Sequence, residues 1–231
     1  MKELHIRPIA VIHTDFSDKF GIPRQSGRVP ALKGTIVMEP EYRVPEAFRG
    51  IEDYSHLWLL FDFSASHREQ WSPTVRPPRL GGNQRVGVFA TRSPFRPNPI
   101  GLSCVTLDST ELTAEGPVLH VSGVDLLDGT PILDIKPYLP YTDSIPDASG
   151  SFGEALRTHQ LSVTFPPELL ALVPADKQQA AVACLAEDPR PSYQHDPERQ
   201  YSMRFAGVDI HFYVQDDCLT VTAVDSVERS E

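Results

Sequence analysis

Short runs of β-type residues, separated by turn-forming residues, fill the first 140 or so residues of this 231-residue chain. The runs are rich in Val, Ile, Thr and aromatic residues, with clusters of Pro, Gly, Asp and Asn between them. Few helical patterns of about twelve residues interrupt them, which disfavours a parallel sheet of βαβ units. The pattern therefore predicts a mainly β fold, a mostly antiparallel barrel or closed sheet. We expect one short helix at Glu41–Arg49 and strands at Leu4–Ile12, Gly34–Met38, Leu57–Phe63, Arg85–Thr91, Ile100–Leu107, Val118–Val124 and Ile132–Ile135.

The second part of the chain has a different pattern. The segment Thr142–Glu154 is polar, rich in turn-forming residues and without periodicity, which is typical of a domain boundary. We predict a barrel domain at residues 1–145, a linker at 146–159 and a small α+β domain at 160–231. That domain is expected to contain strands at Gln160–Phe165, Tyr201–Phe205, Val208–Val214 and Leu219–Val224, with helices at Pro167–Val173 and Ala175–Glu187.

Composition limits the functions and cellular locations that this chain can have. The formal net charge of −10 argues against non-specific binding of nucleic acid, but residues 70–107 contain five arginines and no Asp or Glu. The average charge therefore hides a local cationic segment. No apolar run is long enough for a membrane span, and the amino terminus lacks the apolar stretch of a secretory signal. Three widely spaced cysteines suit a reducing cytoplasm and offer no metal-ligand spacing.

The segment Arg85–Leu107 carries the densest candidate chemistry. Its loop contains three prolines, which fix φ and hold the backbone rigid. A rigid loop with Arg92, Ser93, Arg96 and Asn98 is suited to a preorganised polar site. The same residues are equally compatible with a stiff surface hairpin whose arginines are only solvated. No Rossmann, Walker A or nucleophile-elbow motif accompanies the segment.

Two further segments can each be explained either by function or by structure alone. Asp134 and Lys136 lie two residues apart on an expected strand and so share a face, as part of a polar site or merely as an ion pair. In DPRPSY, two prolines bracket Arg190 and are expected to hold its side chain outward. That segment is also explained by a simple helix stop.

Taken together, these segments resemble the TrmO (TsaA-like, YaeB) family of S-adenosylmethionine-dependent tRNA methyltransferases. The resemblance covers nearly the whole chain, and its block GVFATRSPFRPNPIGLS is highly specific. The other matching pieces, in family order, are VPEAFRGIEDYSHLWLLFDF, TVRPPRLGGNQR, GVDLLDGTPILDIKPYLPY and DPRPSY.

The resemblance implies a single-sheeted β-barrel methyltransferase, neither Rossmann nor knotted, that acts as a homodimer in the cytoplasm without a metal. It implies methylation of N6 of threonylcarbamoyl-adenosine at position 37 of tRNA, with S-adenosylmethionine as cofactor. By motif, the cofactor-binding residues are Pro23, Arg24, Gln25, Ser64, Ala65, Arg92, Leu102, Ser122, Gly123, Val124, Asp125 and Leu126. Ser64 departs from the family pattern, in which many members have His, and His67 follows three residues later.

The remaining expected roles concern the acceptor and the RNA. Lys136 and Tyr138 would line the pocket of the methyl acceptor, with Asp134 orienting Lys136. Arg190 and Tyr193 would hold the modified base or its carboxylate, while Asp188 would cap or brace the turn. Phosphates of the anticodon stem would meet Arg76 and Arg79, joined by Arg96, which lies near the cofactor by family match.

Two other functions remain compatible with the residues. One is a module of the same fold that binds RNA and S-adenosylmethionine as a sensor, without methyl transfer. The other is a methyltransferase of this fold that acts on a different substrate. Retention of DPRPSY favours the tRNA methyltransferase.

Overall fold

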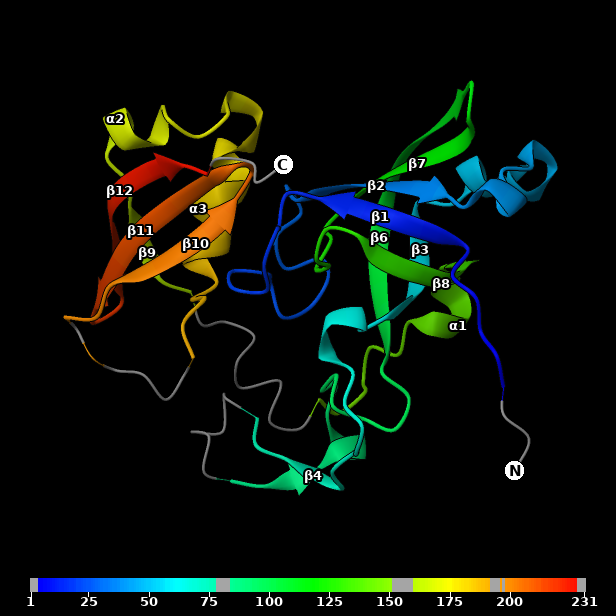
Figure 1. The fold of residues 1–231 in the computed structure, drawn as a ribbon, viewed down its shortest axis with the longest axis horizontal. Coiled ribbons are helices and arrows are strands. Elements are labelled where there is room, and N and C mark those ends of the chain that lie inside the picture. The colour runs from blue at the N-terminus through cyan, green and yellow to red at the C-terminus, as the bar shows by residue number, and fades with distance from the viewer. Residues whose placement is uncertain (1–3, 78–83, 151–159, 192–195, 197, 228–231) are drawn as a thin grey trace.

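Six strands close into an antiparallel barrel, as the sequence pattern predicted. The structure, a computed structural model, describes residues 4–77, 84–150, 160–191, 196 and 198–227. Around the barrel the order is β1-β2-β7-β6-β3-β8, and β8 returns to pair with β1 (Figure 1). The strands are β1 (Ala10–Thr14), β2 (Lys33–Met38), β3 (His56–Asp62), β6 (Ile100–Thr113), β7 (Gly116–Ser122) and β8 (Thr130–Pro137).

Alternation of side chains along each strand fills the barrel. In β3, Leu57, Leu59 and Phe61 are buried, whereas the residues between them lie on the partly exposed outer side. Facing strands add apolar side chains that are wholly buried, including Ile12, Ile36, Leu119 and Ile132. Burial of each such side chain contributes about 1.5–3 kcal/mol to folding.

The expected elements differ from the observed ones mainly at prolines. Glu41–Arg49 is not one helix, because Pro45 cannot continue a helical hydrogen-bond ladder. Two 3-10 turns, Pro40–Tyr42 and Pro45–Phe48, replace it, and a third follows at Ile51–Asp53. The strand expected at Leu4–Ile12 begins only at Ala10, beyond Pro8.

The strand expected at Arg85–Thr91 is also wrong in extent. Only β5 (Val86–Gly87) forms there, pairs with β4 (Thr74–Val75) and leads into a 3-10 turn at Val88–Ala90. Another 3-10 turn, Ser64–Ser66, follows β3. The short helix α1 (Pro140–Asp143) follows β8.

A second sheet lies beside the barrel (Figure 1). Its order is β10-β11-β12-β9, with β12 and β9 parallel and the other pairs antiparallel. Pro174 separates the two expected helices, which are observed as α2 (Pro167–Leu170) and α3 (Gln178–Ala186). A 3-10 turn at Ala175–Lys177 precedes α3. The elements are β9 (Ser162–Thr164), α2 (Pro167–Leu170), α3 (Gln178–Ala186), β10 (Tyr201–Phe205), β11 (Val208–Gln215) and β12 (Cys218–Ser226).

The segment between β1 and β2 joins the barrel to this second sheet. Phe16 is wholly buried, and its ring centroid lies 5.1 Å from that of Phe205. Phe20 stacks at 6.4 Å on both Tyr201 and Phe212. The sheet of the C-terminal part therefore packs directly on a loop of the barrel.

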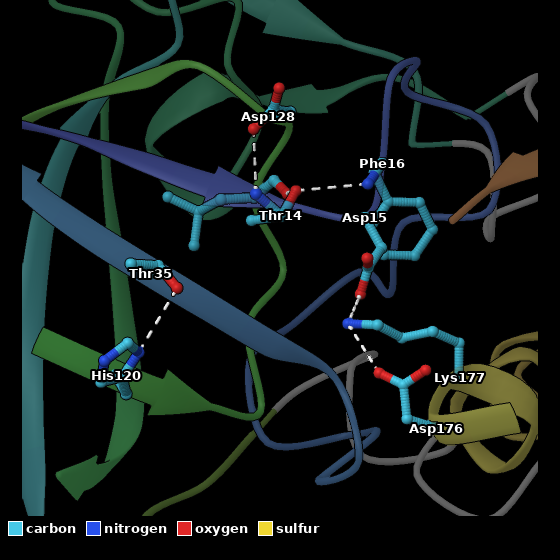
Figure 2. A network of polar contacts seen from close by, with 9 residues as sticks. Thr14, Asp15, Phe16, Thr35, His120, Asp128, Asp176 and Lys177 are labelled. Carbon is cyan, nitrogen blue, oxygen red and sulfur yellow. Dashed lines mark hydrogen bonds and ion pairs between the residues drawn. The ribbon is translucent and has the colours of Figure 1, made fainter. Parts of the chain in front are cut away.

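Charged pairs flank this apolar contact. Lys177 Nζ lies 2.7 Å from Asp15 Oδ2 and 3.9 Å from Asp176 Oδ2. Figure 2 shows the lysine between the two carboxylates. Arg28 donates two hydrogen bonds, at 2.7 and 3.0 Å, to the carboxylate of Glu187, whose side chain is 8% exposed. Such a buried, bidentate pair fixes the orientation of the two parts.

Candidate functional site

A cavity of about 720 Å³ opens at one end of the barrel. The strands β1 and β3 end there, and β6 and β8 begin there, so four segments distant in sequence meet around it. The wall combines apolar surface with cationic and anionic groups. It is formed by residues in 19–25, 61–66, 91–103 and 125–130.

The floor of the cavity depends on Gly101. Phe61 pairs with Gly101 across β3 and β6, and a Cβ on Gly101 would lie 2.2 Å from the Phe61 ring. Only glycine therefore leaves room for this ring, which also contacts Phe63 edge-on at 5.0 Å. Beside it, Ile100 and Leu102 are 37% and 50% exposed, giving the cavity an open apolar side.

The polar wall is built around Asp125. Ser103 Oγ donates a 2.6 Å hydrogen bond to Asp125 Oδ1, and both residues line the cavity. Burial raises the pKa of the Asp125 carboxyl to about 6, while the Ser103 hydrogen bond and the charge of Arg92 act in the opposite direction. Arg92 in turn donates from Nη1 to Gln25 Oε1. The wall thus presents a carboxyl group and a guanidinium group close together.

Nine of the twelve residues predicted to bind a cofactor line this cavity. They are Pro23, Arg24, Gln25, Ser64, Ala65, Arg92, Leu102, Asp125 and Leu126. The structure places the other three, Ser122, Gly123 and Val124, behind the wall, where all three are buried. Gly123, with φ of +74°, accepts a 2.8 Å hydrogen bond from the Gly27 amide and so supports the wall from behind.

Two of the residues predicted to act on the methyl acceptor, Asp134 and Lys136, lie outside the cavity, on the outer face of β8. Asp134 Oδ2 and Lys136 Nζ form an ion pair of 2.8 Å, and both side chains are about half exposed. Asp134 is opposite Leu60, which is opposite Leu102 at the cavity edge. Two strand spacings, about 10 Å, therefore separate the Asp134 and Leu102 backbones.

Tyr138 continues that outer face. Its ring lies 5.7 Å from Trp58 and 6.1 Å from His56, centroid to centroid. Its amide donates a 3.0 Å hydrogen bond to the His56 carbonyl, so its backbone is tied to β3. Lys136 and Tyr138 thus present a cation and an aromatic surface along one face beside the cavity.

The expectation for Arg190 is wrong in one respect. Its side chain is only 11% exposed and turns back onto Asp188 through hydrogen bonds of 2.8 and 3.0 Å. Asp188, at φ +50°, therefore braces the turn. The Arg190 carbonyl accepts a 3.1 Å hydrogen bond from Arg24 in the cavity wall, so this turn of the C-terminal part touches the site.

The arginines predicted to contact RNA lie in different environments. Arg76 is exposed on the segment after β4. Arg96 lines the cavity and donates a 3.1 Å hydrogen bond to the Thr91 carbonyl, which braces the proline-rich loop. Arg79 and Tyr193 lie outside the described residues.

Sequence reasoning missed several residues of the cavity. Lys19 Nζ donates to the Ala65 carbonyl at 2.5 Å and to Ser66 Oγ at 2.8 Å, which ties the loop after β1 to the loop after β3. Asp62 lines the cavity and bonds His67 Nε2 at 2.7 Å. No local pattern marks the contacts of Lys19, because they form only when two separate loops fold together, whereas Asp62 and His67 meet across a single short turn.

The described residues offer neither a metal site nor a membrane-spanning helix. Among the described residues, no group of three or more His, Cys, Asp or Glu side chains is arranged to hold a metal ion. In the same part of the chain, no helix has both the length and the apolar character needed to cross a membrane.

Comparison with known proteins identifies the relatives of the chain. Residues 11–144 match the family model for the tRNA-methyltransferase O N-terminal domain, and residues 158–227 match the TrmO C-terminal domain. An Escherichia coli protein described as tRNA (adenine(37)-N6)-methyltransferase is 40% identical over 233 residues, covering 97% of this chain and 99% of its own.

Two further comparisons concern the fold and the ligand. A crystal structure of TrmO from Pseudomonas aeruginosa matches with a TM-score of 0.80 and 35% identity, over 98% of this chain and 99% of the other. A Pyrococcus abyssi relative, 40% identical over 59% of this chain and 69% of its own, is described as a probable S-adenosyl-L-methionine-binding protein. The fold, both domain matches and the near full-length similarity agree, and the chain belongs to the TrmO family of tRNA methyltransferases.

Proposed function

We propose that this protein is an S-adenosylmethionine-dependent tRNA methyltransferase that modifies N6 of adenosine 37. The E. coli relative, 40% identical over nearly the whole chain, is described by this activity. The observation that carries the proposal is the cavity at the barrel end, where Arg92 and Asp125 stand beside an apolar floor. The face with Asp134 and Lys136 adjoins it.

The groups of the cavity match the chemistry of S-adenosylmethionine. When bound, this cofactor supplies a methyl group from a sulfonium cation. Arg92 would hold the carboxylate of its methionine moiety, because a guanidinium pairs well with a carboxylate. Asp125 would hold the ammonium group, and Leu102 and Leu126 offer apolar surface for the adenine. A buried carboxyl group with a raised pKa suits this role, since a cation beside it restores the charged form.

The face beside the cavity supports a role in activating the acceptor. N6 of a threonylcarbamoylated adenosine is conjugated to a carbonyl, so its lone pair becomes nucleophilic only as its proton leaves. Lys136 stabilises the resulting negative charge, and Asp134 orients Lys136 through their 2.8 Å ion pair. Tyr138 gives the base an aromatic surface. Because N6 must also contact the methyl group of the cofactor, this role requires the long Lys136 side chain to extend from β8 toward the cavity edge, two strand spacings or about 10 Å away at the backbone.

The threonylcarbamoyl group accounts for the DPRPSY segment. We assign Arg190 and Tyr193 to the modified base or its threonyl carboxylate. The support is the hydrogen bond from Arg24 to the Arg190 carbonyl, which anchors this turn at the cavity wall. Arg76, Arg79 and Arg96 are assigned to phosphates of the RNA, since they belong to the segment without acidic residues.

The same proposal covers the organisation of the chain. A barrel domain at residues 1–145 holds the cofactor, a linker runs through 146–159, and an α+β domain at 160–231 contributes DPRPSY. We further propose a homodimer that works in the cytoplasm. The three separate thiols support this location.

A transfer assay tests the function. The full chain is incubated with methyl-tritiated S-adenosylmethionine and with tRNA that carries or lacks the threonylcarbamoyl group at adenosine 37. We expect label in the modified tRNA, located at N6 by nucleoside analysis. Equal labelling of both tRNAs would refute the threonylcarbamoyl requirement. Cofactor binding without transfer to either tRNA would instead identify a binding module.

A further inference from the structure

Two large aromatic side chains lie stacked and exposed outside the barrel core. The ring centroids of Trp71 and Phe89 are 6.2 Å apart, with an angle of 30° between the planes. The two residues are 52% and 73% exposed. Exposed rings of this size usually mark a contact surface, because their burial is favourable. Neither residue belongs to the cavity described above.

The backbone on both sides of the pair is fixed by hydrogen bonds. Strands β4 and β5 pair through Thr74 with Gly87 and Val75 with Val86. The Val88 amide donates a 3.0 Å hydrogen bond to the Pro73 carbonyl, between the two aromatic positions. The stack is therefore held in place before any partner arrives, which lowers the entropic cost of binding.

Arginines lie on the same hairpin as the stack and on the neighbouring proline-rich loop. Arg76 and Arg85 are exposed on its hairpin, and Arg85 Nη1 donates to Thr74 Oγ1 at 3.2 Å. The Arg68 guanidinium lies 3.6 Å from the centroid of the Phe95 ring, on the proline-rich loop. Glu69 is the nearest acidic residue in sequence, and no other follows it until residue 108. The surface is thus aromatic and cationic.

Both residues of the stack are close in sequence to residues that line the cavity. Ser66 lines the cavity five residues before Trp71, a reach of at most about 17 Å. Thr91 lines it two residues after Phe89, a reach of at most about 7 Å. An RNA strand whose target base reaches the cofactor at the cavity edge can therefore also reach the stack with a neighbouring base.

We propose that Trp71 and Phe89 form a stacking platform for an unpaired base of the RNA substrate, next to the nucleotide that is methylated. This inference rests on the proposed function. Stacking on aromatic side chains suits single-stranded nucleotides of any sequence, and nearby arginines attract the phosphates. Contact with a second copy is less favourable, since a twofold axis at this patch brings the same arginines together.

The test measures binding of a fluorescein-labelled anticodon stem-loop RNA to the full chain by anisotropy, at fixed and varied salt. Trp71→Ala and Phe89→Ala are each expected to weaken binding roughly 5- to 100-fold. Trp71→Phe keeps most of the affinity, because a ring remains. The dependence on salt and the affinity for S-adenosylmethionine stay unchanged. Leu112→Ala, at a residue 70% exposed on the far hairpin of β6 and β7, serves as the matched control.

Two outcomes overturn the inference. The first is RNA affinity of both alanine variants within twofold of the parent, while the parent methylates tRNA; the proposed function then stands without the platform. The second is a lower oligomeric mass of Trp71→Ala by sedimentation, with RNA affinity restored at high protein concentration; the surface then belongs to a contact between copies. A parent that neither binds nor methylates tRNA refutes the proposed function, and the platform with it.

Discussion

The segment between β1 and β2 borders the C-terminal sheet on one side and the cavity on the other, and the two borders differ in chemistry. Toward the sheet, Phe16 is wholly buried and Phe20 stacks on two rings. Toward the cavity, Arg24 and Gln25 are exposed. We infer that the contact with the sheet mainly stabilises the fold. The residues at the cavity contribute less to stability and are available to bind a ligand.

A second pair of contacts sharpens this difference. Arg28 and Glu187 form a bidentate pair at the sheet contact, with the carboxylate almost fully buried. Asp134 and Lys136 form an ion pair on the outer face, with both side chains about half exposed. Exposed pairs contribute little to stability, so the role that we propose for the second pair can be tested without unfolding the protein. The following changes separate the two roles.

Phe16→Ala is expected to have the largest effect. Its ring is 0% exposed and packs on Phe205, so its removal leaves a cavity at the sheet contact. We expect a loss of about 3–5 kcal/mol in the free energy of unfolding, measured by urea denaturation. The folded fraction should bind S-adenosylmethionine normally. Leu172→Ala is the control, at a residue that is 55% exposed in the C-terminal part. Its free energy of unfolding should remain within about 0.5 kcal/mol of that of the parent.

Arg92→Ala is expected to have the opposite effect, a loss of cofactor binding with little loss of stability. The change removes the guanidinium assigned to the cofactor's carboxylate and leaves the core untouched. Affinity for S-adenosylmethionine by calorimetry should fall about 10- to 100-fold, the value of one charge-assisted hydrogen bond. The melting temperature should barely change. Arg49→Ala, at an exposed residue away from the cavity, is the control, and equal affinities for both variants would contradict the assignment.

Asp125→Asn tests the link between the cavity and pH. Burial raises the pKa of this carboxyl from its ordinary 3.8 to about 6, so between these two pH values the folded protein retains a proton that the unfolded chain has lost. Stability therefore falls as pH rises from about 4 to 6 and stays low above. Asn cannot ionise, so the Asp125→Asn variant does not lose this stability and should be more stable than the parent above pH 6, by about 3 kcal/mol. Parallel stability curves for the parent and the variant would refute the raised pKa.

Asp134→Asn should have the smallest effect on folding. Its ion pair with Lys136 is exposed, so the free energy of unfolding should change by less than about 0.5 kcal/mol. Turnover should fall by about tenfold or more, because Lys136 loses its orientation. Single-turnover methyl transfer at saturating cofactor measures this directly. A loss of stability with normal turnover would show that the pair is structural.

The barrel could be predicted from sequence because its signal is local. In β3, alternate residues such as Leu57 and Leu59 point into the core, and this period of two is written in the sequence itself. Errors arose where proline overrides a run of β-formers or helix-formers, as at Pro45. They also arose where few backbone bonds form, as in the short strand β5.

The site was less predictable because its contacts join distant loops. Asp125 meets Ser103 across 22 positions, and Lys19 meets Ala65 across 46. The need for Gly101 becomes visible only when the Phe61 ring lies against it. Resemblance to the family pointed to most of the cavity wall, but not to these supporting contacts or to the buried position of Arg190.

The most direct test is a crystal structure of the full chain with S-adenosylhomocysteine, the product left after methyl transfer. The account predicts the ligand in the cavity of about 720 Å³, with its carboxylate at Arg92 and its ammonium group at Asp125. The site is contradicted if the ligand lies elsewhere. One alternative is the groove of about 340 Å³ lined by Phe20, Cys184 and Pro189, between the barrel and the second sheet.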